Sequence, residues 1–129
     1  MNIKHKLALT LLTGVAIGLA AGTAIHAQQT KAPPGYVVGL LEVTDPAGFK
    51  KYTEALPPTL APFNGHFIIR GSKLQALEGD PPKGFAVLVF DSVDQARAWY
   101  ESPAYQAIVP LRLNSAKTTA FVVEGIAAQ

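Results

Sequence analysis

Four short segments rich in β-branched and aromatic residues, separated by helical segments, constrain this chain most strongly. The segments YVVGLLEV (36–43), HFIIRG (66–71), GFAVLVF (84–90) and TTAFVVEG (118–125) predict strands. Residues with helical spacing lie between the first and second strands and between the third and fourth, whereas the turn-rich LEGDPPKG joins the second to the third. The predicted order is therefore β-α-β-β-α-β.

Prolines divide both helical segments. Pro57 and Pro58 interrupt the first, which we expect to end before Asn64, and Ser102 with Pro103 split the second. The fold class predicted from this order is α+β: a ferredoxin-like sandwich with a four-stranded antiparallel sheet and the helices on one face.

The predicted strands are apolar on both faces. In the third strand, Phe85, Val87 and Val89 alternate with a second apolar set, Ala86, Leu88 and Phe90. An antiparallel sheet with helices on one side usually exposes polar residues on the other, and an uncovered apolar face would measure several hundred Å². We therefore expect a homodimer in which a second copy of the sheet covers this face.

The first 27 residues have the pattern of a secretory signal peptide. A basic MNIKHK precedes the apolar LALTLLTGVAIGLAAGTA, and AIHA offers a small residue before Gln28. An uncleaved membrane anchor is the alternative, because residues 7–24 approach the roughly 20 apolar residues that span a bilayer. The Ala- and Gly-rich composition favours cleavage. Either interpretation predicts export, so we expect a periplasmic or secreted protein with a disordered lead (28–34) and one domain (35–126).

Charge and composition exclude several function classes. The chain has 11 Lys and Arg against 9 Asp and Glu, and loss of Lys4 and Lys6 with the signal leaves 9 against 9. A neutral domain without a basic stripe gives no reason to expect nucleic acid or, after cleavage, a membrane as partner. The sequence has no cysteine, no two-His metal spacing and no phosphate or dinucleotide motif. We therefore expect no metal and no cofactor.

Several segments resemble the family catalogued as domain of unknown function 1330. They are the run from YVVGLLEV to HFIIRG, LEGD, VLVFDSVDQARAWYESPAYQAIVPLRLNSAKT and VVEG, so the resemblance covers residues 36–125. It implies membership of the dimeric α+β barrel superfamily, in which a ferredoxin-like subunit packs its sheet on its twin's. The family has no established activity. Superfamily relatives include cofactor-free oxygenases, isomerase-like enzymes, haem-handling proteins and ligand sensors, so the fold alone does not indicate a reaction.

The chain departs from this family's pattern before and after the second strand. Relatives commonly read HGG where this chain has Phe63, Asn64 and Gly65, and a second Gly after Arg70 is replaced by Ser72. Any role that relatives give to that His is therefore not transferred to this chain.

Aromatic and basic residues of the second helical segment are the first candidates for a site. Trp99 and Tyr105 have the spacing of residues that dock a helix on a sheet, and buried aromatics usually belong to a core. Trp99 is also a candidate ligand contact. Arg112 shares a helix face with Tyr105, so its guanidinium can be drawn inward to meet a carboxylate or a ligand.

Polar residues on the strands are the second set of candidates. Glu42 alternates with apolar residues, Arg70 is expected on the face of His66, and Glu124 on the face of Val122. One interpretation is a structural ion pair of Arg70 with Glu42 or Glu124. The other is a ligand site in which Arg70 holds an oxygen atom of the ligand in its fork of donors.

The sequence leaves three functions open. We favour an exported dimer that binds a small, largely apolar molecule. The alternatives are a cofactor-independent oxidoreductase or isomerase, with His66 and Tyr52 as candidate catalytic residues, and a purely structural dimer. Whether the chain is an enzyme, and on which molecule it acts, is not decided by the residues.

Overall fold

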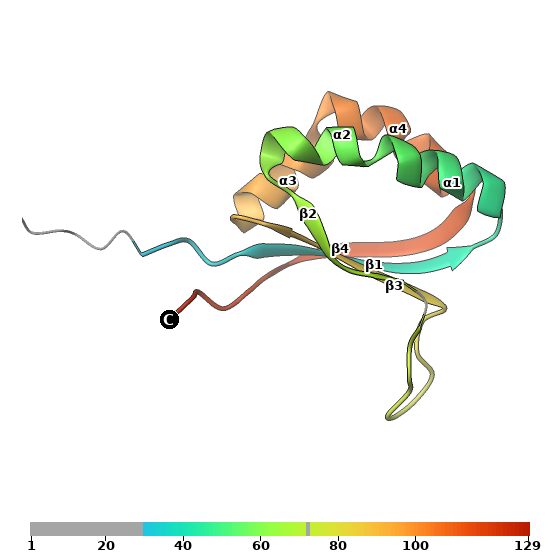
Figure 1. Cartoon of the computed structure of the whole chain (residues 1–129), viewed down its shortest axis with the longest axis horizontal. Helices are drawn as coiled ribbons and strands as arrows, with labels where there is room; N and C mark the ends of the chain where they lie inside the picture. Colours follow the sequence, from blue (N-terminus) through green and yellow to red (C-terminus); the bar gives the residue numbers. More distant parts are fainter. Residues whose placement is uncertain (1–29, 72) are drawn as a thin grey trace, which may run out of the picture.

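The sheet has the predicted strand order. The computed structural model describes residues 30–71 and 73–129. Within this part of the chain, the strands are β1 (Gly35–Val43), β2 (His66–Gly71), β3 (Gly84–Phe90) and β4 (Ala116–Glu124). They form one antiparallel sheet in the order β2-β3-β1-β4, with β3 and β1 at its centre (Figure 1). This arrangement confirms the predicted ferredoxin-like α+β fold.

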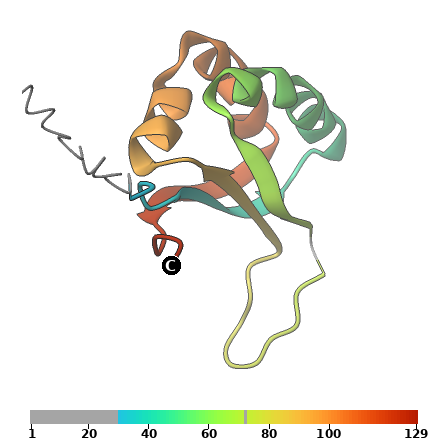
Figure 2. The same ribbon diagram turned by 60° about the vertical axis from the view of Figure 1, so that its left-hand side comes forward.

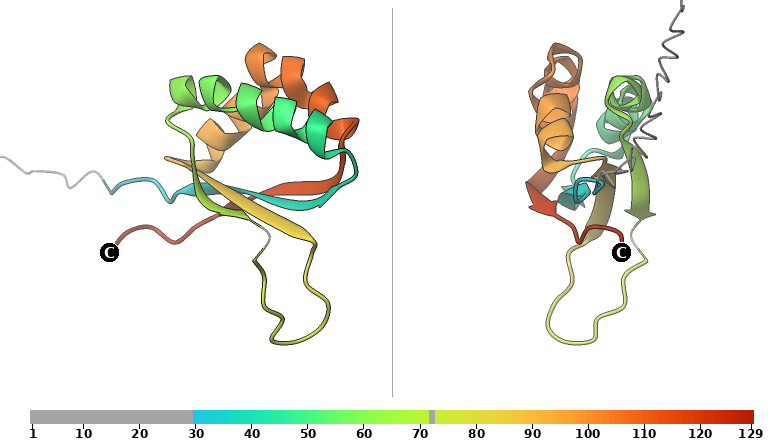
Figure 3. Two further views of the ribbon diagram at one scale, coloured as in Figure 1. Left: turned by 45° about the vertical axis from the view of Figure 1, so that its right-hand side comes forward. Right: turned by 90° about the vertical axis from the view of Figure 1, so that its left-hand side faces the viewer.

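The helices of the described residues cover one face of this sheet (Figure 2). The first connection contains α1 (Pro46–Ala55), α2 (Pro57–Leu60) and the short 3-10 helix η1 (Ala61–Phe63). The second contains α3 (Val93–Glu101) and α4 (Pro103–Leu113). Seen end-on, the two connections form two columns side by side above the strands (Figure 3). The sandwich therefore has two layers, and the opposite face of the sheet carries no helix of the described chain.

The breaks within the helical segments follow from proline and from side-chain caps. Pro57 and Pro103 each occupy the first position of a helix, where the missing N–H removes no intrahelical hydrogen bond. The hydroxyl of Ser102 accepts a hydrogen bond from the backbone N–H of Tyr105 at 3.3 Å, which caps α4. Asn64 has φ 52° and ends the first connection in the left-handed conformation, as predicted.

The core lies between the helices and the sheet. Leu88 and Phe90 of β3 meet Trp99 of α3 and Tyr105 of α4, and Trp99 is only 1% exposed. Tyr52, Leu56 and Leu60 of the first connection and Ala96 of α3 complete the buried cluster. Leu88 and Phe90 lie opposite Val37 and Gly35, so the core is centred on the half of the sandwich nearest the start of β1.

The far side of the sheet is apolar, as the strand pattern predicted. Phe121 and Val123 of β4 are 48% and 45% exposed, although both are large hydrophobic residues. The strand register places them on one face with residues of all the other strands: Tyr36, Val38, Leu40, Ile69, Phe85, Val87 and Val89. We call this set the outer apolar face.

A β-bulge in β2 changes which residues of that strand face the helices. Phe67 is opposite Leu88 and Ile69 is opposite Val87, so Ile68 is an extra residue without a partner on β3. Beyond the bulge, Arg70 is opposite Ala86 and shares the helix side of the sheet with Phe67. The expectation that Arg70 lies on the face of His66 was therefore wrong, because simple alternation does not hold across a bulge.

The connection from β2 to β3 extends away from the sandwich (Figures 2 and 3). It carries Leu77, whose side chain is 97% exposed. Residues 30–34 lead into β1 without helix or strand, and the Pro34 carbonyl accepts a hydrogen bond from the N–H of Gly125 at 2.7 Å. Among the described residues, no helix has the length and apolarity needed to span a bilayer. The predicted signal peptide (1–27) lies outside the described residues.

Candidate ligand-binding site

A cavity of about 640 Å³ lies between the helices and the half of the sheet nearest the end of β1. Its floor comes from the strands and its roof from α1 and α4, which lie above the sheet in Figure 1. A volume of this size falls in the range that accommodates small-molecule ligands. Most of its walls are apolar, and the larger helix-facing side chains among them are Val37, Leu41, Val43, Phe49, Leu56, Phe67, Leu88 and Trp99.

A row of small residues across the sheet explains why side chains do not fill this space. Gly39 of β1 is opposite Ala86 of β3 on one side and Ala120 of β4 on the other. The next row along the sheet carries the larger Leu88, Val37 and Val122, which pack against the core. Because Gly and Ala project at most one carbon from the strand, they leave space between this part of the floor and the helices. We call Ala86, Gly39 and Ala120 the small-residue row.

Arg112 is the buried cation of the cavity wall. It lies in the last turn of α4, where the helix dipole favours a positive charge, and is 7% exposed. Its Nη1 donates to the hydroxyl of Thr118 on β4, whereas its buried Nε–H has no hydrogen-bond partner. Among the described residues, ion pairs within 4.0 Å join only Lys50 to Glu54 and Lys83 to Glu42. The guanidinium was expected to turn inward, and it does so without meeting a carboxylate of the described residues.

Two tyrosine hydroxyls lie beside Arg112 in the same cavity. The hydroxyl of Tyr52 on α1 is 3.2 Å from that of Tyr105 on α4, and both side chains are buried. Burial raises the pKa of the Tyr52 phenol well above its ordinary value. The Tyr105 hydroxyl raises this pKa further, and the Arg112 guanidinium opposes the rise only in part. At neutral pH, Tyr52 therefore keeps its proton and can donate a hydrogen bond, but it cannot serve as a phenolate base.

Trp99 combines a structural role with a place in the cavity wall. Its indole N–H donates to the hydroxyl of Thr59 at 3.1 Å, and its ring lies 4.0 Å, centroid to centroid, from that of Tyr105. The N–H is thus satisfied within the core, and the ring is 1% exposed although it borders the cavity. Trp99 therefore offers a ligand no free hydrogen-bond donor and acts mainly as a core residue.

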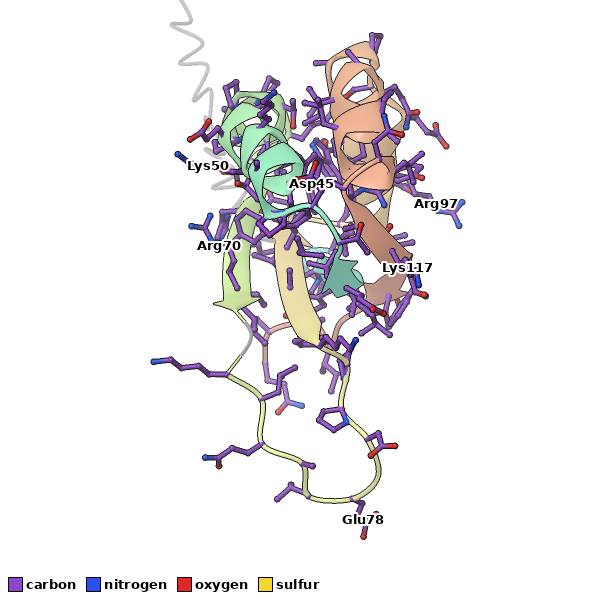
Figure 4. The ribbon with its side chains drawn as sticks, turned by 90° about the vertical axis from the view of Figure 1, so that its right-hand side faces the viewer. Asp45, Lys50, Arg70, Glu78, Arg97 and Lys117 are labelled. Carbon is purple, nitrogen blue, oxygen red and sulfur yellow. The ribbon has the colours of Figure 1, made fainter. Side chains whose placement is uncertain are left out.

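Arg70 lies at the edge of the cavity and is exposed. Its guanidinium carbon is 5.1 Å from the centroid of the Phe67 ring, a cation–π arrangement on the helix side of β2. Figure 4 shows the side chain at the β2 edge of the sheet, below α1. The bulge at Ile68 therefore brings Arg70 to the same cavity as Trp99 and Arg112.

The two glutamates predicted as site residues lie elsewhere. Glu42 belongs to the opposite face of β1, and its carboxylate bonds the Lys83 ammonium at 3.0 Å. This bond and the Lys83 charge hold the pKa of Glu42 below its usual value. Glu124 is opposite Gly35, at the end of the sheet remote from the cavity. The interpretation that Arg70 forms an ion pair with Glu42 or Glu124 was wrong, because Arg70 faces the helices and stacks on Phe67.

His66 is exposed, and its register partner is Val89, which belongs to the outer apolar face. The sheet therefore separates His66 from the cavity and from Tyr52, the other residue proposed for catalysis. In the described part of the chain, no three His, Asp or Glu side chains come close enough together to hold a metal ion.

Sequence reasoning missed the small-residue row. Gly39, Ala86 and Ala120 are ordinary residues when each strand is considered alone, and they become one feature only when the register places them side by side. The signal available in the sequence was that three of the four predicted strands carry Gly or Ala among larger residues on the helix-facing side. Without the register, these positions could not be aligned with one another.

The family model for a domain of unknown function (DUF1330) matches residues 34–126 of this sequence. The chain belongs to the DUF1330 family. The match spans all four strands and both helical connections, so the cavity is formed entirely by the DUF1330 domain. No protein with curated annotation matches the sequence.

Solved structures similar to this DUF1330 chain share its fold at low sequence identity. A protein of unknown function from Rhodopseudomonas palustris has a TM-score of 0.59 and 14% identity, covering 74% of this chain and 85% of its own. SnoaB, a cofactor-independent oxygenase from Streptomyces nogalater, has a TM-score of 0.52 and 16% identity, covering 75% and 95%. A dimeric ferredoxin-like protein of unknown function from Thermobifida fusca has a TM-score of 0.51 and 21% identity, covering 75% and 95%. At such identities the likeness supports the ferredoxin-like fold and no specific activity.

Proposed function

We propose that this protein binds a small, largely apolar molecule in the cavity between its helices and its sheet. The observation that carries the proposal is the small-residue row, which leaves about 640 Å³ under α1 and α4 instead of a packed core. Close packing is the rule in protein interiors, and space that side chains leave unfilled costs stability unless something occupies it. A row of Gly39, Ala86 and Ala120 across three strands of the sheet is therefore best explained by an occupant.

The walls support an apolar ligand with one polar end. Aliphatic and aromatic side chains form most of the surface. The polar groups of the interior gather toward the β4 edge, where Tyr52, Tyr105, Arg112 and Thr118 lie together. Such a division, with an apolar body and a few placed polar groups, is typical of small-molecule sites.

Filling the cavity tests this proposal. We expect Ala86→Leu and Ala120→Leu to prevent binding of the neutral probe naphthalene-2-carboxamide, measured by isothermal titration calorimetry. Ala107→Leu adds the same atoms on the exposed face of α4 and serves as the matched control, with binding unchanged. Native mass spectrometry of the protein from its own host should also show a bound small molecule. A wild type that carries no such molecule and binds no apolar probe contradicts the proposal.

A second candidate function is cofactor-independent catalysis as an oxidoreductase or isomerase. The arrangement of Tyr52, Tyr105 and Arg112 inside one cavity favours it, because hydroxyl and guanidinium donors can stabilise an enolate oxygen. A molecule recovered unchanged after long incubation with the protein in air would favour binding without turnover. Consumption of dioxygen or a shifted double bond would favour the enzyme.

We also propose that the protein acts as a homodimer through its outer apolar face. The residues that support this are large and exposed, with Phe121 and Val123 on β4 and Ile69 on β2. A second copy of the same face is apolar as well and would cover it under two-fold symmetry. The neighbour from Thermobifida fusca is described as dimeric, which agrees with this arrangement.

Export to the periplasm or the exterior is proposed from residues 1–27 alone. Their basic start, apolar run and small residue before Gln28 support a cleaved signal peptide. Intact-mass measurement on protein from the native host should give a chain that begins at Gln28. A membrane-bound species that retains Met1 would support the anchor instead.

A further inference from the structure

The inference deepens the proposed function, on which it rests, by naming the chemical class of the ligand. From the placement of Arg112, we infer that the molecule in the cavity carries a carboxylate, which the Arg112 guanidinium binds at the β4 end of the cavity. The apolar body of the molecule then lies along the small-residue row, toward β2.

The Arg112 guanidinium has no negatively charged partner among the described residues. A buried guanidinium is costly unless an anion and hydrogen-bond acceptors compensate it. Arg112 is 7% exposed, its Nε–H has no partner, and no carboxylate of the described residues pairs with it. The helix dipole at the end of α4 compensates only a fraction of one charge. An anion that enters the cavity would supply the remaining compensation.

The hydrogen-bond donors around Arg112 favour a carboxylate over other anions. A guanidinium presents parallel N–H groups that match the two oxygens of a carboxylate, and Arg112, which lines the cavity, makes one side-chain hydrogen bond within the described residues, from Nη1 to Thr118. The Tyr52 and Tyr105 hydroxyls share one hydrogen bond with each other, so one of the two protons is free to be donated. One cation with neutral donors around it suits a single negative charge better than a doubly charged phosphate.

The positions of Arg112 and Arg70 in the cavity decide which of the two is the anchor of the carboxylate. Thr118, which holds Arg112, belongs to β4, whereas Arg70 belongs to β2, and these strands are the two edges of the sheet. Three inter-strand spacings of about 4.8 Å place these edges about 14 Å apart. Between them lies the small-residue row. Because the exposed Arg70 already stacks on Phe67, Arg112 is the better anchor and Arg70 lies near the ligand's far end.

Two probes of the same shape test the inference: naphthalene-2-carboxylate and its neutral amide, naphthalene-2-carboxamide. We expect the wild type to bind the carboxylate about tenfold more tightly or better, because hydrogen bonds to charged groups are the stronger ones. Arg112→Met should remove this preference while the amide still binds. Arg97→Met removes an exposed arginine of α3, which points away from the sandwich in Figure 4, and should leave both affinities unchanged.

The outcomes separate the inference from the proposed function. Equal affinity of the wild type for both probes overturns the inference that the ligand carries a carboxylate, but it is consistent with the proposed binding of an apolar molecule. Failure of both probes to bind overturns the proposed function itself. A purely structural Arg112 would make Arg112→Met less stable, whereas a cation kept for a ligand should give a melting temperature that is unchanged or higher.

A measurement on the wild type keeps the test valid even if Arg112→Met does not fold. The chain has three arginines, so its NMR spectrum contains three arginine Nε–H signals, and Arg97→Met identifies one of them. We expect naphthalene-2-carboxylate to move the signal of the buried, slowly exchanging Nε–H of Arg112. The same shift with the amide, or no shift with the carboxylate, contradicts the inference.

Discussion

The hydroxyl oxygen of Tyr52 lies 3.2 Å from the hydroxyl oxygen of Tyr105, and this contact joins α1 to α4 across the roof of the cavity. Tyr52 is 7% exposed and Tyr105 3%, so neither hydroxyl can turn freely to water. The contact therefore stabilises the position of both helices and places two polar groups beside Arg112.

Removal of one hydroxyl should destabilise the fold. In Tyr52→Phe, the Tyr105 hydroxyl loses its partner, and an unsatisfied buried polar group costs about 1–3 kcal/mol. We expect the double variant with Tyr105→Phe to lose less than the sum of the single losses, since it leaves no unpaired hydroxyl. Urea unfolding measures all three, with Tyr100→Phe on the exposed side of α3 as control. Additive losses would show that the two hydroxyls do not interact.

The same tyrosine predicts the behaviour of the protein in alkali. Burial raises the pKa of Tyr52 above its ordinary value of 10.0, so the folded chain keeps a proton that the unfolded chain releases. Its contribution to stability is complete below pH 10 and decreases as the pH rises from there. The free energy of unfolding of the wild type should therefore fall more steeply above pH 10 than that of Tyr52→Phe. Parallel curves for the two proteins would contradict the raised pKa.

A charge on the outer apolar face should separate the proposed dimer without unfolding the subunit. Phe121 is 48% exposed in the isolated chain, so Phe121→Glu meets water in a monomer but loses its hydration at an interface. We expect sedimentation velocity at micromolar concentration to give a dimer for the wild type and a folded monomer for this variant. Ala107→Glu, on the exposed face of α4, is the control that should remain dimeric. A wild-type monomer would remove the basis of the prediction.

Two glycines facing the helix layer should respond to alanine in opposite ways. A Cβ on Gly65 would lie 2.4 Å from the Phe90 ring, which is 1% exposed and cannot easily move, so Gly65→Ala should destabilise the protein by about 1–3 kcal/mol. A Cβ on Gly39 would meet only the Ala86 carbonyl at 3.9 Å, because the cavity lies above it. Gly39→Ala should therefore be neutral or stabilising by up to about 1 kcal/mol. Thermal unfolding of both variants checks the contrast.

Much of this fold could be predicted from the sequence because its signals are local. Strand propensity gave β2 and β3 with their observed bounds, and prolines gave the helix breaks at Pro57 and Pro103. Alternation in β3 also assigned Phe90 and Leu88 to one face correctly, since that strand is regular.

The candidate site depended on relationships that no single segment contains. The bulge at Ile68 reversed the facing of Arg70, so the ion pair of Arg70 with Glu42, one of the two interpretations of these residues, does not form. Arg112 was expected to turn inward from its helix face. That it would do so without a carboxylate partner among the described residues could be known only from the positions of their carboxylates.

The extra residue in β2 has a consequence for how relatives of this chain should be compared. Ile68 has no partner on β3, so a chain that lacks it could keep His66 opposite Val89, Phe67 opposite Leu88 and Arg70 opposite Ala86. A one-residue gap at this point of an alignment would then mark a change in strand length with no change in which side chains enter the cavity. A gap farther along the chain, between Arg70 and Gly84, would fall in the connection from β2 to β3. Differences in chain length among relatives at these two places would therefore not change the cavity. Differences in the ligand that relatives bind should be sought at Gly39, Ala86 and Ala120 instead.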